Sequence, residues 1–397
     1  MSEWKEYKLG EIADVQTGPF GSQLHQSDYV DVGIPSIMPV NIGERMNIST
    51  EKIVYITEKD AMRLSRYRVQ NGDIVYSRRG DVEKCAYINE SEEGWLCGTG
   101  CLRIRIDSAH ADSKFVAYYL STEDMKSWIS NNAVGTTMPN LNSSILQQVP
   151  LSLPSLDEQK RIASILCSLD DKIDLLNREN ATLEAMAETL FRQWFIEEAK
   201  EDWEEKSLSD CIMLIGGGTP KTSESNYWNG SICWLSGGDI ANNHKGFVLE
   251  TEKSISDEGL NNSSAKLLSE NAMVVSARGT VGKYCLLSRP MAFSQSNYGI
   301  MPKYDNCFYF TYLLIAYYID ELQSAAYGSV FDTITTKTFE GVNVALPQDK
   351  NYIIEFEKMA RPYFSKMKNN ALQIQSLART CDLLLSKLIS NEISILL

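Results

Sequence analysis

Two long segments of the chain place apolar residues at alternating intervals of four and three positions. In the first segment the repeating positions are Ile162, Leu166, Leu169, Ile173, Leu176, Asn180, Leu183, Ala187, Leu190 and Trp194. In the second they are Phe356, Ala360, Tyr363, Met367, Asn370, Ile374, Leu377, Cys381, Leu384 and Leu388. A mean period of about 3.5 residues is typical of a coiled-coil seam. The pattern therefore predicts two long helices that pack against each other.

Each seam contains one asparagine, Asn180 at an a position and Asn370 at a d position. A buried amide is costly unless it is hydrogen-bonded, and a second asparagine is a suitable partner. If the helices run antiparallel with these two residues side by side, every layer pairs an a with a d residue. The layers would then include Ile162 with Leu388, Leu166 with Leu384, and Trp194 with Phe356. The alternative is two amphipathic helices that pack separately on their own domains.

Pro362 lies inside the second helical segment. Proline lacks the N–H group of a helix hydrogen bond, and its ring clashes with the preceding turn. We therefore expect a kink or a break near residues 358–361.

The remaining sequence has the pattern of mixed α/β domains. Short β-type runs at residues 53–56, 73–77 and 102–106 are separated by turns rich in Gly, Asn and Ser. Residues 114–130 have a helical pattern, and the prolines of residues 150–154 predict an extended strap. The resulting segments are a first domain over 1–156, a spacer helix over 157–202, a second domain over 203–348 and a C-terminal helix over 349–397.

The two domains repeat one another at an offset of 199 residues, most clearly in residues 71–84 and 270–283. Val75, Ser77, Arg79, Gly80, Val82 and Lys84 have identical counterparts in Val274, Ser276, Arg278, Gly279, Val281 and Lys283. A duplicated unit predicts two similar sites in one molecule. Such an arrangement suits a target that itself has two parts.

Composition is that of an ordinary globular protein, with 43% hydrophobic and 23% charged residues among 397. There is no run of 18 apolar residues, so no membrane segment is expected, and the first residues lack the pattern of a signal peptide. The nine cysteines include no Cys-x-x-Cys pair. We therefore expect free thiols in a reducing cytoplasm and no metal site.

The net charge of −14 by itself argues against a nucleic-acid partner. However, acidic residues are densest in the spacer helix rather than in the repeated domains. The first domain carries a local basic cluster of Arg63, Arg66, Arg68, Arg78, Arg79 and Lys84. A globally acidic protein can still present a basic face, with modest affinity for DNA unless a partner adds positive charge.

Three kinds of loop in each domain are candidates for DNA contact. The Ser-x-Arg-Gly element predicts a strand followed by a turn that presents arginine, whose guanidinium binds phosphates or guanine edges. A Gly-rich loop lets backbone amides approach phosphate, and a polar loop offers Asn and Thr side chains. The candidates are Ser77, Arg78, Arg79, Lys84, Thr17, Ser22, Gln23, Thr136 and Asn140 in the first domain, and Ser276, Arg278, Lys283, Thr219, Lys221 and Thr333 in the second. Ordinary surface hairpins and tight turns share these patterns.

Candidate catalytic groups are sparse. The three histidines do not recur at matching positions, and no cluster of His, Cys or Asp has metal-ligand spacing. Residues 277–284 resemble a nucleotide-binding P-loop only in part, because Ala277 replaces its first glycine and Tyr284 its final Ser or Thr. A duplicated protein without a duplicated catalytic constellation is expected to be a binding protein. An acidic DNA mimic, a nucleotide-using enzyme and a coiled-coil scaffold remain as alternatives.

Several motifs resemble those of the specificity subunit of type I restriction–modification systems, over essentially the whole chain. Residues 72–80 resemble the family's strand-and-turn element, and residues 153–173 resemble the start of its central helix. Residues 217–221, followed by Tyr227-Trp228, resemble a common start of a target recognition domain. The second half departs from the family pattern at Ser209 and near Asn351-Tyr352.

The resemblance implies an α+β fold in which two mixed α/β target recognition domains are joined by two long antiparallel coiled-coil helices, with pseudo-two-fold symmetry. Each domain would read one half of an asymmetric site in double-stranded DNA. Two modification subunits would dock on this body and methylate adenine N6, and restriction subunits would cleave DNA. The chain itself would be non-catalytic and bind no cofactor, because S-adenosylmethionine, Mg²⁺ and ATP are expected on the partner subunits.

Overall fold

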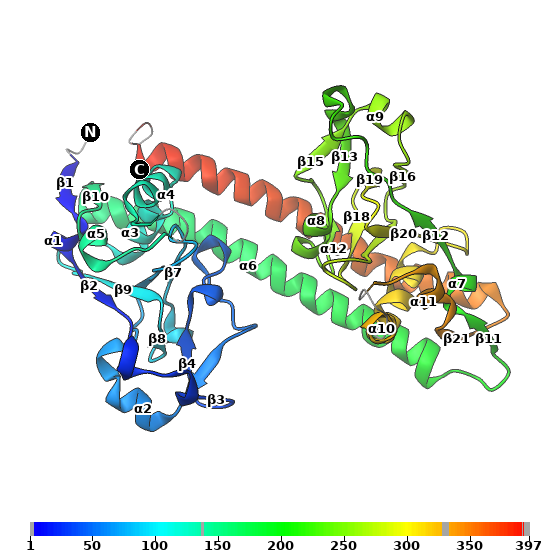
Figure 1. Ribbon diagram of the computed structural model, residues 1–397, viewed down its shortest axis with the longest axis horizontal. Helices are drawn as coiled ribbons and strands as arrows, with labels where there is room; N and C mark the ends of the chain where they lie inside the picture. The colour runs from blue at the N-terminus through cyan, green and yellow to red at the C-terminus, as the bar shows by residue number, and fades with distance from the viewer. Residues whose placement is uncertain (1–3, 136–138, 328–332, 391, 393–397) are drawn as a thin grey trace. The chain divides into compact units, whose positions relative to one another are not determined.

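Two long helices correspond to the two apolar seams (Figure 1). α6 spans Leu156–Arg192 and continues as a π-helical turn, Gln193–Glu197, and α12 spans Lys350–Ile389. The computed structural model describes residues 4–135, 139–327, 333–390 and 392. The chain divides into unit 1, Met1–Lys172 with Leu377–Leu397, and unit 2, Ile173–Ser376. Each unit therefore contains part of both helices, and the segment boundaries drawn at residues 156, 202 and 348 stay a prediction.

The helices pair through the two seam asparagines, as predicted. Asn370 Nδ2 donates hydrogen bonds to Asn180 Oδ1 at 2.9 Å and to Glu179 Oε2 at 2.8 Å. Asn370 is only 1% exposed, so its amide group has to find its partners inside the protein, and these two hydrogen bonds supply them.

The layers on both sides of the asparagine pair follow the same antiparallel register. In unit 2 the ring centroids of Trp194 and Phe356 lie 5.8 Å apart. In unit 1 the residues of the expected layers gather in one apolar cluster, which includes Ile162, Leu166, Leu384 and Leu388. The predicted fold class and helix register are confirmed, and the separate packing of the two helices is excluded in each unit.

α12 continues through Pro362 as one helix. Of the kink or break predicted near residues 358–361, the break is therefore wrong, whereas the kink stays a prediction. Proline in a helix interior costs about 3 kcal/mol. However, Ala360 and Phe364 are fully buried on either side of it. Their packing holds both flanking turns in place, because helices in proteins are stabilised mainly by tertiary contacts.

Unit 1 contains a four-stranded antiparallel main sheet in the order β2-β9-β6-β7 and a smaller sheet in the order β3-β5-β4-β8. A ribbon pairs β1 with β10, which is the strap expected at residues 150–154. The strands are β1 Lys5–Lys8, β2 Ala13–Thr17, β3 Tyr29–Val30, β4 Ile34–Ile37, β5 Val54–Ile56, β6 Ile74–Ser77, β7 Cys85–Tyr87, β8 Leu96–Cys97, β9 Cys101–Ile106 and β10 Pro150–Leu153. The helices are α1 Leu9–Ile12, α2 Glu58–Arg63, α3 Ser113–Leu120, α4 Glu123–Asn132 and α5 Ser143–Gln147.

The single helix expected over residues 114–130 is instead the pair α3 and α4. The Thr122 side chain accepts a hydrogen bond from the Met125 N–H and caps a new helix. Threonine at this position satisfies an otherwise unpaired backbone donor, and this favours a fresh start over continuation.

Unit 2 repeats this plan with a five-stranded main sheet in the order β12-β20-β17-β18-β14 and a smaller sheet in the order β15-β13-β19-β16. β11 pairs with β21, as β1 pairs with β10. The strands are β11 Glu204–Ser207, β12 Ile212–Gly216, β13 Trp228–Leu235, β14 Phe247–Val248, β15 Lys253–Ile255, β16 Leu267–Leu268, β17 Met273–Ser276, β18 Tyr284–Leu287, β19 Met291–Phe293, β20 Asn297–Pro302 and β21 Asn343–Leu346. The helices are α7 Leu208–Cys211, α8 Gly237–Asn242, α9 Asp257–Asn261, α10 Phe308–Tyr327 and α11 Thr336–Glu340.

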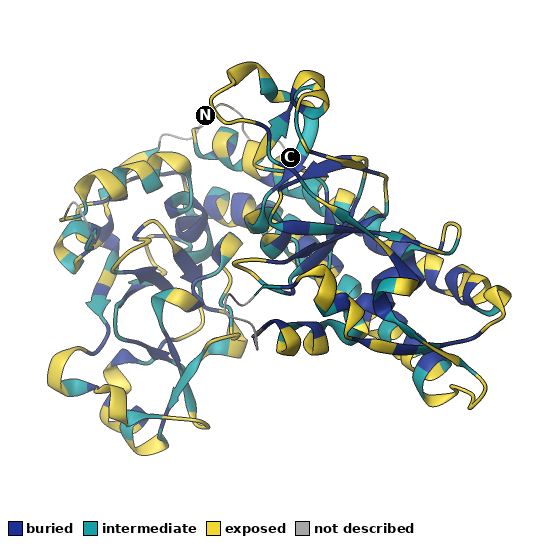
Figure 2. Cartoon of the chain, turned by 45° about the vertical axis from the view of Figure 1, so that its right-hand side comes forward, coloured by how far each residue is buried: buried dark blue, intermediate teal, exposed yellow. Residues whose placement is uncertain are grey.

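The central strands of the two main sheets explain why the repeat is clearest there. Every residue of β6 and β17 is buried, and both strands end in a buried serine. Figure 2 shows buried strands in dark blue and exposed turns in yellow. A continuous apolar run is what a strand covered on both faces requires.

Two glutamates of the long helices are buried in unit 2. Glu184 of α6 accepts a hydrogen bond from the Tyr312 hydroxyl at 2.8 Å. Glu357 of α12 accepts from the backbone N–H groups of Tyr309 and Phe310 at 3.0 and 2.9 Å. Burial, partly offset by these hydrogen bonds, raises the pKa of each carboxyl to about 7.

We predict that Asn180→Leu destabilises the protein by about 1–2 kcal/mol, because the buried Asn370 amide loses an acceptor. Adding Asn370→Leu should recover most of that loss, since replacing both polar partners by apolar groups removes the unpaired donor. Urea unfolding of the single and double variants measures the coupling. Losses that simply add in the double variant would show that the two asparagines do not stabilise one another.

We predict that Glu184→Gln reduces the pH dependence of stability. The folded-state pKa of about 7 lies above the ordinary value of 4.5. The folded state therefore binds this proton more tightly, and stability falls as pH rises from 4.5 through 7. Glutamine keeps an acceptor for Tyr312 without a charge. The variant should exceed the wild type by roughly 2–3 kcal/mol at pH 8 and by little at pH 5 in urea unfolding; an equal difference at both pH values would contradict a raised pKa.

Candidate nucleic-acid interface

The candidate loops of unit 1 meet at one edge of its main sheet. β2 and β6 end at this edge with Thr17 and Ser77, whereas β9 and β7 begin there with Cys101 and Cys85. Because neighbouring strands run antiparallel, these connections leave the sheet on the same side. We call the segments 17–23, 77–84, 97–101 and 139–141 the loop edge of unit 1.

Unit 2 has the equivalent loop edge. β12 and β17 end there with Gly216 and Ser276, whereas β20 and β18 begin there with Asn297 and Tyr284. Its segments are 216–221, 276–283, 293–297 and 333–334. The backbone N–H that follows Ser276 donates to Ser296 O at 3.0 Å, just as the N–H that follows Ser77 donates to Gly100 O at 2.8 Å.

The Ser-x-Arg-Gly turn has the same geometry in both units. The Ser77 hydroxyl donates to Arg79 O at 3.0 Å, and the Ser276 hydroxyl donates to Arg278 O at 3.2 Å. The glycine that follows each arginine has a positive φ, +75° for Gly80 and +77° for Gly279. Both serines are fully buried. They shape the turn from inside, so their assignment as DNA contacts stays a prediction that their burial does not favour.

The polar loop joins this turn in unit 1. Arg79 and Asn140 form an isolated β-bridge, and Leu141 N–H donates to Arg78 O at 2.8 Å. In unit 2 the Ile334 N–H makes the matching hydrogen bond to Ala277 O at 3.2 Å. Asn140 in unit 1 and Thr333 in unit 2 are partly exposed, whereas the candidate Thr136 lies outside the described residues.

The Gly-rich loops are held close to the chain rather than opened for an anion. A Cβ atom on Gly18 would lie 2.1 Å from Gly98 O, and a Cβ atom on Gly217 would lie 2.1 Å from Ser294 O. These glycines therefore allow two backbone segments to touch at the loop edge. This contact, rather than a phosphate cradle, explains Gly18 of the first loop and Gly217 of the second.

The side chains of these loops differ between the units. Thr17 and Thr219 are partly buried, while Ser22 and Lys221 are exposed. Gln23 Oε1 accepts a hydrogen bond from the Tyr67 hydroxyl at 2.7 Å, and this ties the first loop to a neighbouring turn. The two loops thus present different groups from similar positions.

The exposed arginines are the strongest candidates for DNA contact at the loop edges. Arg79 and Arg278 are both exposed at the tips of equivalent turns. Arg78 is partly buried, with its guanidinium 5.9 Å from the ring centroid of Phe20. Phe20 is 57% exposed and was not expected from the sequence as a site residue. The sequence feature that could have identified Phe20 is its place as an aromatic residue in a glycine-containing loop, residues 18–21.

The lysine that both hairpins share, Lys84 in unit 1 and Lys283 in unit 2, lies beside a long helix. Lys84 forms an ion pair with Asp81 at 2.8 Å and lines a cavity of 760 Å³ that also includes Asp382 of α12. Lys283 lines a cavity of 560 Å³ that also includes Glu188 of α6. Their assignment as DNA contacts stays a prediction, with less support from the geometry than that of the arginines.

Two cysteines at the loop edge of unit 1 are buried. Burial raises the pKa of Cys97 to about 12 and that of Cys101 well above its ordinary value, so neither thiol supplies a thiolate near neutral pH. Within the described ranges, no three His, Cys, Asp or Glu residues are grouped to hold a metal ion. No helix in the described part of the chain is long and apolar enough to cross a bilayer.

Comparison with known proteins gives a consistent match. Residues 1–185 and 200–356 match the type I restriction modification DNA specificity domain. The type I restriction enzyme HindI specificity subunit of Haemophilus influenzae is 23% identical over 99% of this chain and 100% of that protein. The MjaIX specificity subunit of Methanocaldococcus jannaschii is 24% identical over 99% and 94%, respectively. The S subunit of a type I restriction–modification system from M. genitalium has the same fold, with a TM-score of 0.58 at 15% identity over 98% of this chain and 96% of that one.

We predict that Gly217→Ala destabilises the protein by about 1–3 kcal/mol, because its methyl group would overlap a backbone carbonyl that cannot yield. The neighbouring Gly216→Ala is a matched control, since nothing lies within 4 Å of the added Cβ atom. Its effect should stay within about 0.5 kcal/mol. Urea unfolding measures both variants, and equal effects would refute the close backbone approach at this loop edge.

Proposed function

The chain belongs to the family of type I restriction–modification DNA specificity subunits, and on that basis we propose that its two loop edges read the two halves of one asymmetric DNA site. Each unit would contact one half-site through the segments of its loop edge. The family carries two target recognition domains, and the two loop edges are the surfaces best suited to that role.

One observation carries this proposal: the two loop edges share a backbone framework but differ in side chains. The exposed arginine of the turn is common to both, as Arg79 and Arg278. The preceding residue is Arg78 in unit 1 and Ala277 in unit 2. A shared arginine suits phosphate or guanine, and differing neighbours suit different base sequences. An acidic DNA mimic would not require matched arginines at two exposed turns.

The pairing of α6 with α12 supports a second part of the proposal. Antiparallel helices with a defined register are suited to setting the gap between the two half-sites. Asn180 and Asn370 would specify that register, as single buried polar residues do in coiled coils. In this role the helices act as the spacer of the reader rather than as a contact surface for bases.

Catalysis would come from partner subunits. Two modification subunits would methylate adenine N6 in the half-sites, and restriction subunits would cleave DNA. S-adenosylmethionine, Mg²⁺ and ATP would bind to those partners, and this chain would supply no catalytic residue. The partners would also supply positive charge, which a chain of net charge −14 needs for tight DNA binding.

We predict that Arg79→Ala and Arg278→Ala relax sequence preference in different half-sites. Loss of a good arginine contact to a base edge weakens binding to the preferred base by roughly ten- to hundredfold and relaxes specificity there, whereas loss of a phosphate contact would weaken binding to all sequences alike. The measurement is long-read sequencing of methylated adenines on a random-site library, with the complete methyltransferase complex. Lys303→Ala is a matched control, because this exposed lysine follows β20 at the opposite end of the strand from the loop edge.

The result expected is one degenerate half-site for each arginine variant and an unchanged site for Lys303→Ala. If both arginine variants altered the same half-site, or altered both, the assignment of one unit to each half would be wrong.

A further inference from the structure

A cationic residue in a left-handed backbone conformation occurs at matching places in the two units. Arg45, in the 3₁₀ turn Glu44–Met46, has φ +51°, and Lys245 has φ +65°. Each follows the strand of the smaller sheet that makes a parallel pair, β4 in unit 1 and β13 in unit 2. When Arg45 is aligned with Lys245, residues 43–46 and 243–246 are identical at no position. The geometry is therefore shared although the local sequence is not.

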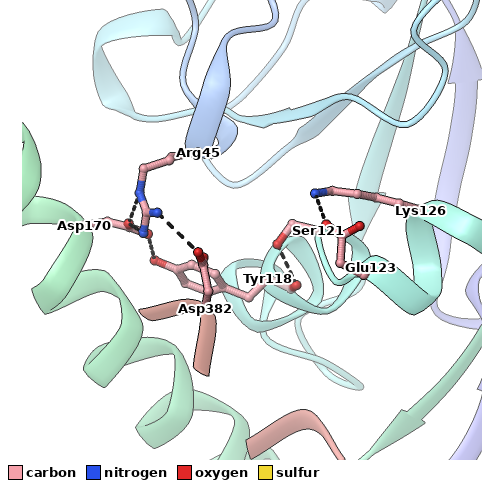
Figure 3. A network of polar contacts seen from close by, with 7 residues as sticks. All are labelled: Arg45, Tyr118, Ser121, Glu123, Lys126, Asp170 and Asp382. Atoms are coloured by element: carbon pink, nitrogen blue, oxygen red, sulfur yellow. Dashed lines mark hydrogen bonds and ion pairs between the residues drawn. The ribbon is translucent and has the colours of Figure 1, made fainter. Parts of the chain in front are cut away.

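In unit 1 the left-handed residue binds the long helix α6. Arg45 Nε donates to Asp170 Oδ1 at 2.9 Å, and a terminal nitrogen of the guanidinium donates to the same oxygen. The Tyr118 hydroxyl of α3 donates to Asp170 Oδ2 at 2.6 Å. Figure 3 shows Arg45 between Asp170 and Asp382, with the Tyr118 hydroxyl directed at Asp170. The Asp382 oxygen is 3.8 Å from the guanidinium.

In unit 2 the same three kinds of group meet, again on α6. Lys245 Nζ pairs with Glu188 Oε1 at 3.0 Å. The buried Tyr312 hydroxyl of α10 donates to Glu184 Oε1 at 2.8 Å and also lies 3.3 Å from Lys245 O. Glu184 and Glu188 are one helical turn apart and divide between them the two roles that Asp170 has alone.

The loop that carries each cation also packs on the second strand of the hairpin that contains the Ser-x-Arg-Gly turn, β7 in unit 1 and β18 in unit 2. Lys245 N–H donates to Tyr284 O at 2.9 Å, and Tyr284 is the first residue of β18. In unit 1 Met46 shares a buried cluster with Cys85, the first residue of β7. Each cation therefore lies between α6 and the hairpin whose turn presents Arg79 or Arg278. Non-glycine residues avoid this backbone conformation, and its persistence at two divergent sequences indicates a functional constraint.

We propose that Arg45 and Lys245 are positioning residues that set the angle of each loop edge on α6, and thereby the gap between half-sites that the protein accepts. This inference rests on the proposed function above. Asp170 and Glu188 are the anchors on the helix. We call the ion pairs Arg45–Asp170 and Lys245–Glu188 the helix locks. The bases read in each half-site depend on the loop edges, so loss of a helix lock changes the accepted gap between half-sites and leaves the half-site sequences intact.

The test uses the complete methyltransferase complex on DNA in which the two half-sites are separated by gaps one or two base pairs shorter or longer than the preferred one. The wild type should methylate one gap length. Arg45→Met and, separately, Lys245→Met should raise methylation at neighbouring gaps about tenfold relative to the preferred gap, as small misplacements change rates on this scale. Arg45→Lys should restore the narrow profile, and Asp170→Asn, which keeps an acceptor for Tyr118, should behave as Arg45→Met does.

Lys126→Met is the matched control, because Lys126 lines the same 760 Å³ cavity and pairs with Glu123 rather than with a long helix. Lys245→Met tests the idea even if Arg45 variants fold poorly, since the Lys245 side chain is 42% exposed. If Arg45→Met, Lys245→Met and Asp170→Asn all methylated the same gap length as the wild type, or if they altered the half-site bases, the positioning role alone would be overturned. A wild-type complex without any bipartite site would instead overturn the proposed function.

Discussion

The fold depends on the antiparallel pairing of α6 with α12 at the Asn180–Asn370 contact. The Asn370 amide is buried, and its donors reach Asn180 and Glu179 on the facing helix. Sliding one helix along the other would bury that amide without acceptors, at a cost of about 1–3 kcal/mol. A single polar pair therefore specifies one register among several that the apolar residues alone would tolerate.

Neither unit has a closed core without both helices. The main cluster of unit 2 includes Phe191 and Phe195 of the α6 segment together with Phe356 and Phe364 of α12. The main cluster of unit 1 includes residues from the start of α6 and the end of α12. Each domain is thus completed by one segment that follows it in sequence and another that comes from far along the chain. The same packing carries α12 through Pro362, where local propensity favours an interruption.

In each loop edge, the residues that shape the turns are distinct from the side chains proposed to contact DNA. Buried serines, left-handed glycines and close backbone contacts recur in both units and shape the turns. Side chains around them differ: the residue before the shared arginine is Arg78, beside the exposed Phe20, in unit 1 and the buried Ala277 in unit 2. This division lets base preference change at the surface while the turn that presents the arginine stays the same. The ion pairs Arg45–Asp170 and Lys245–Glu188 on α6 are a further case, because their geometry recurs in both units while the residues differ.

The sequence by itself determined the elements whose information lies within a few residues of one another. The seam period and the strand-and-turn motif each lie within a short segment, because helix and strand geometry repeats every few positions. The asparagine pair and the repeat then follow from comparing two such segments far apart in the chain. Only the tertiary structure decided which candidate side chains face solvent. It buried Ser77 and Ser276, placed Lys84 and Lys283 beside the long helices, and brought Arg45 to Asp170 across 125 residues of chain. Such contacts join segments with no local pattern in common, and their energy comes from burial that exists only once the domains have packed on the helices.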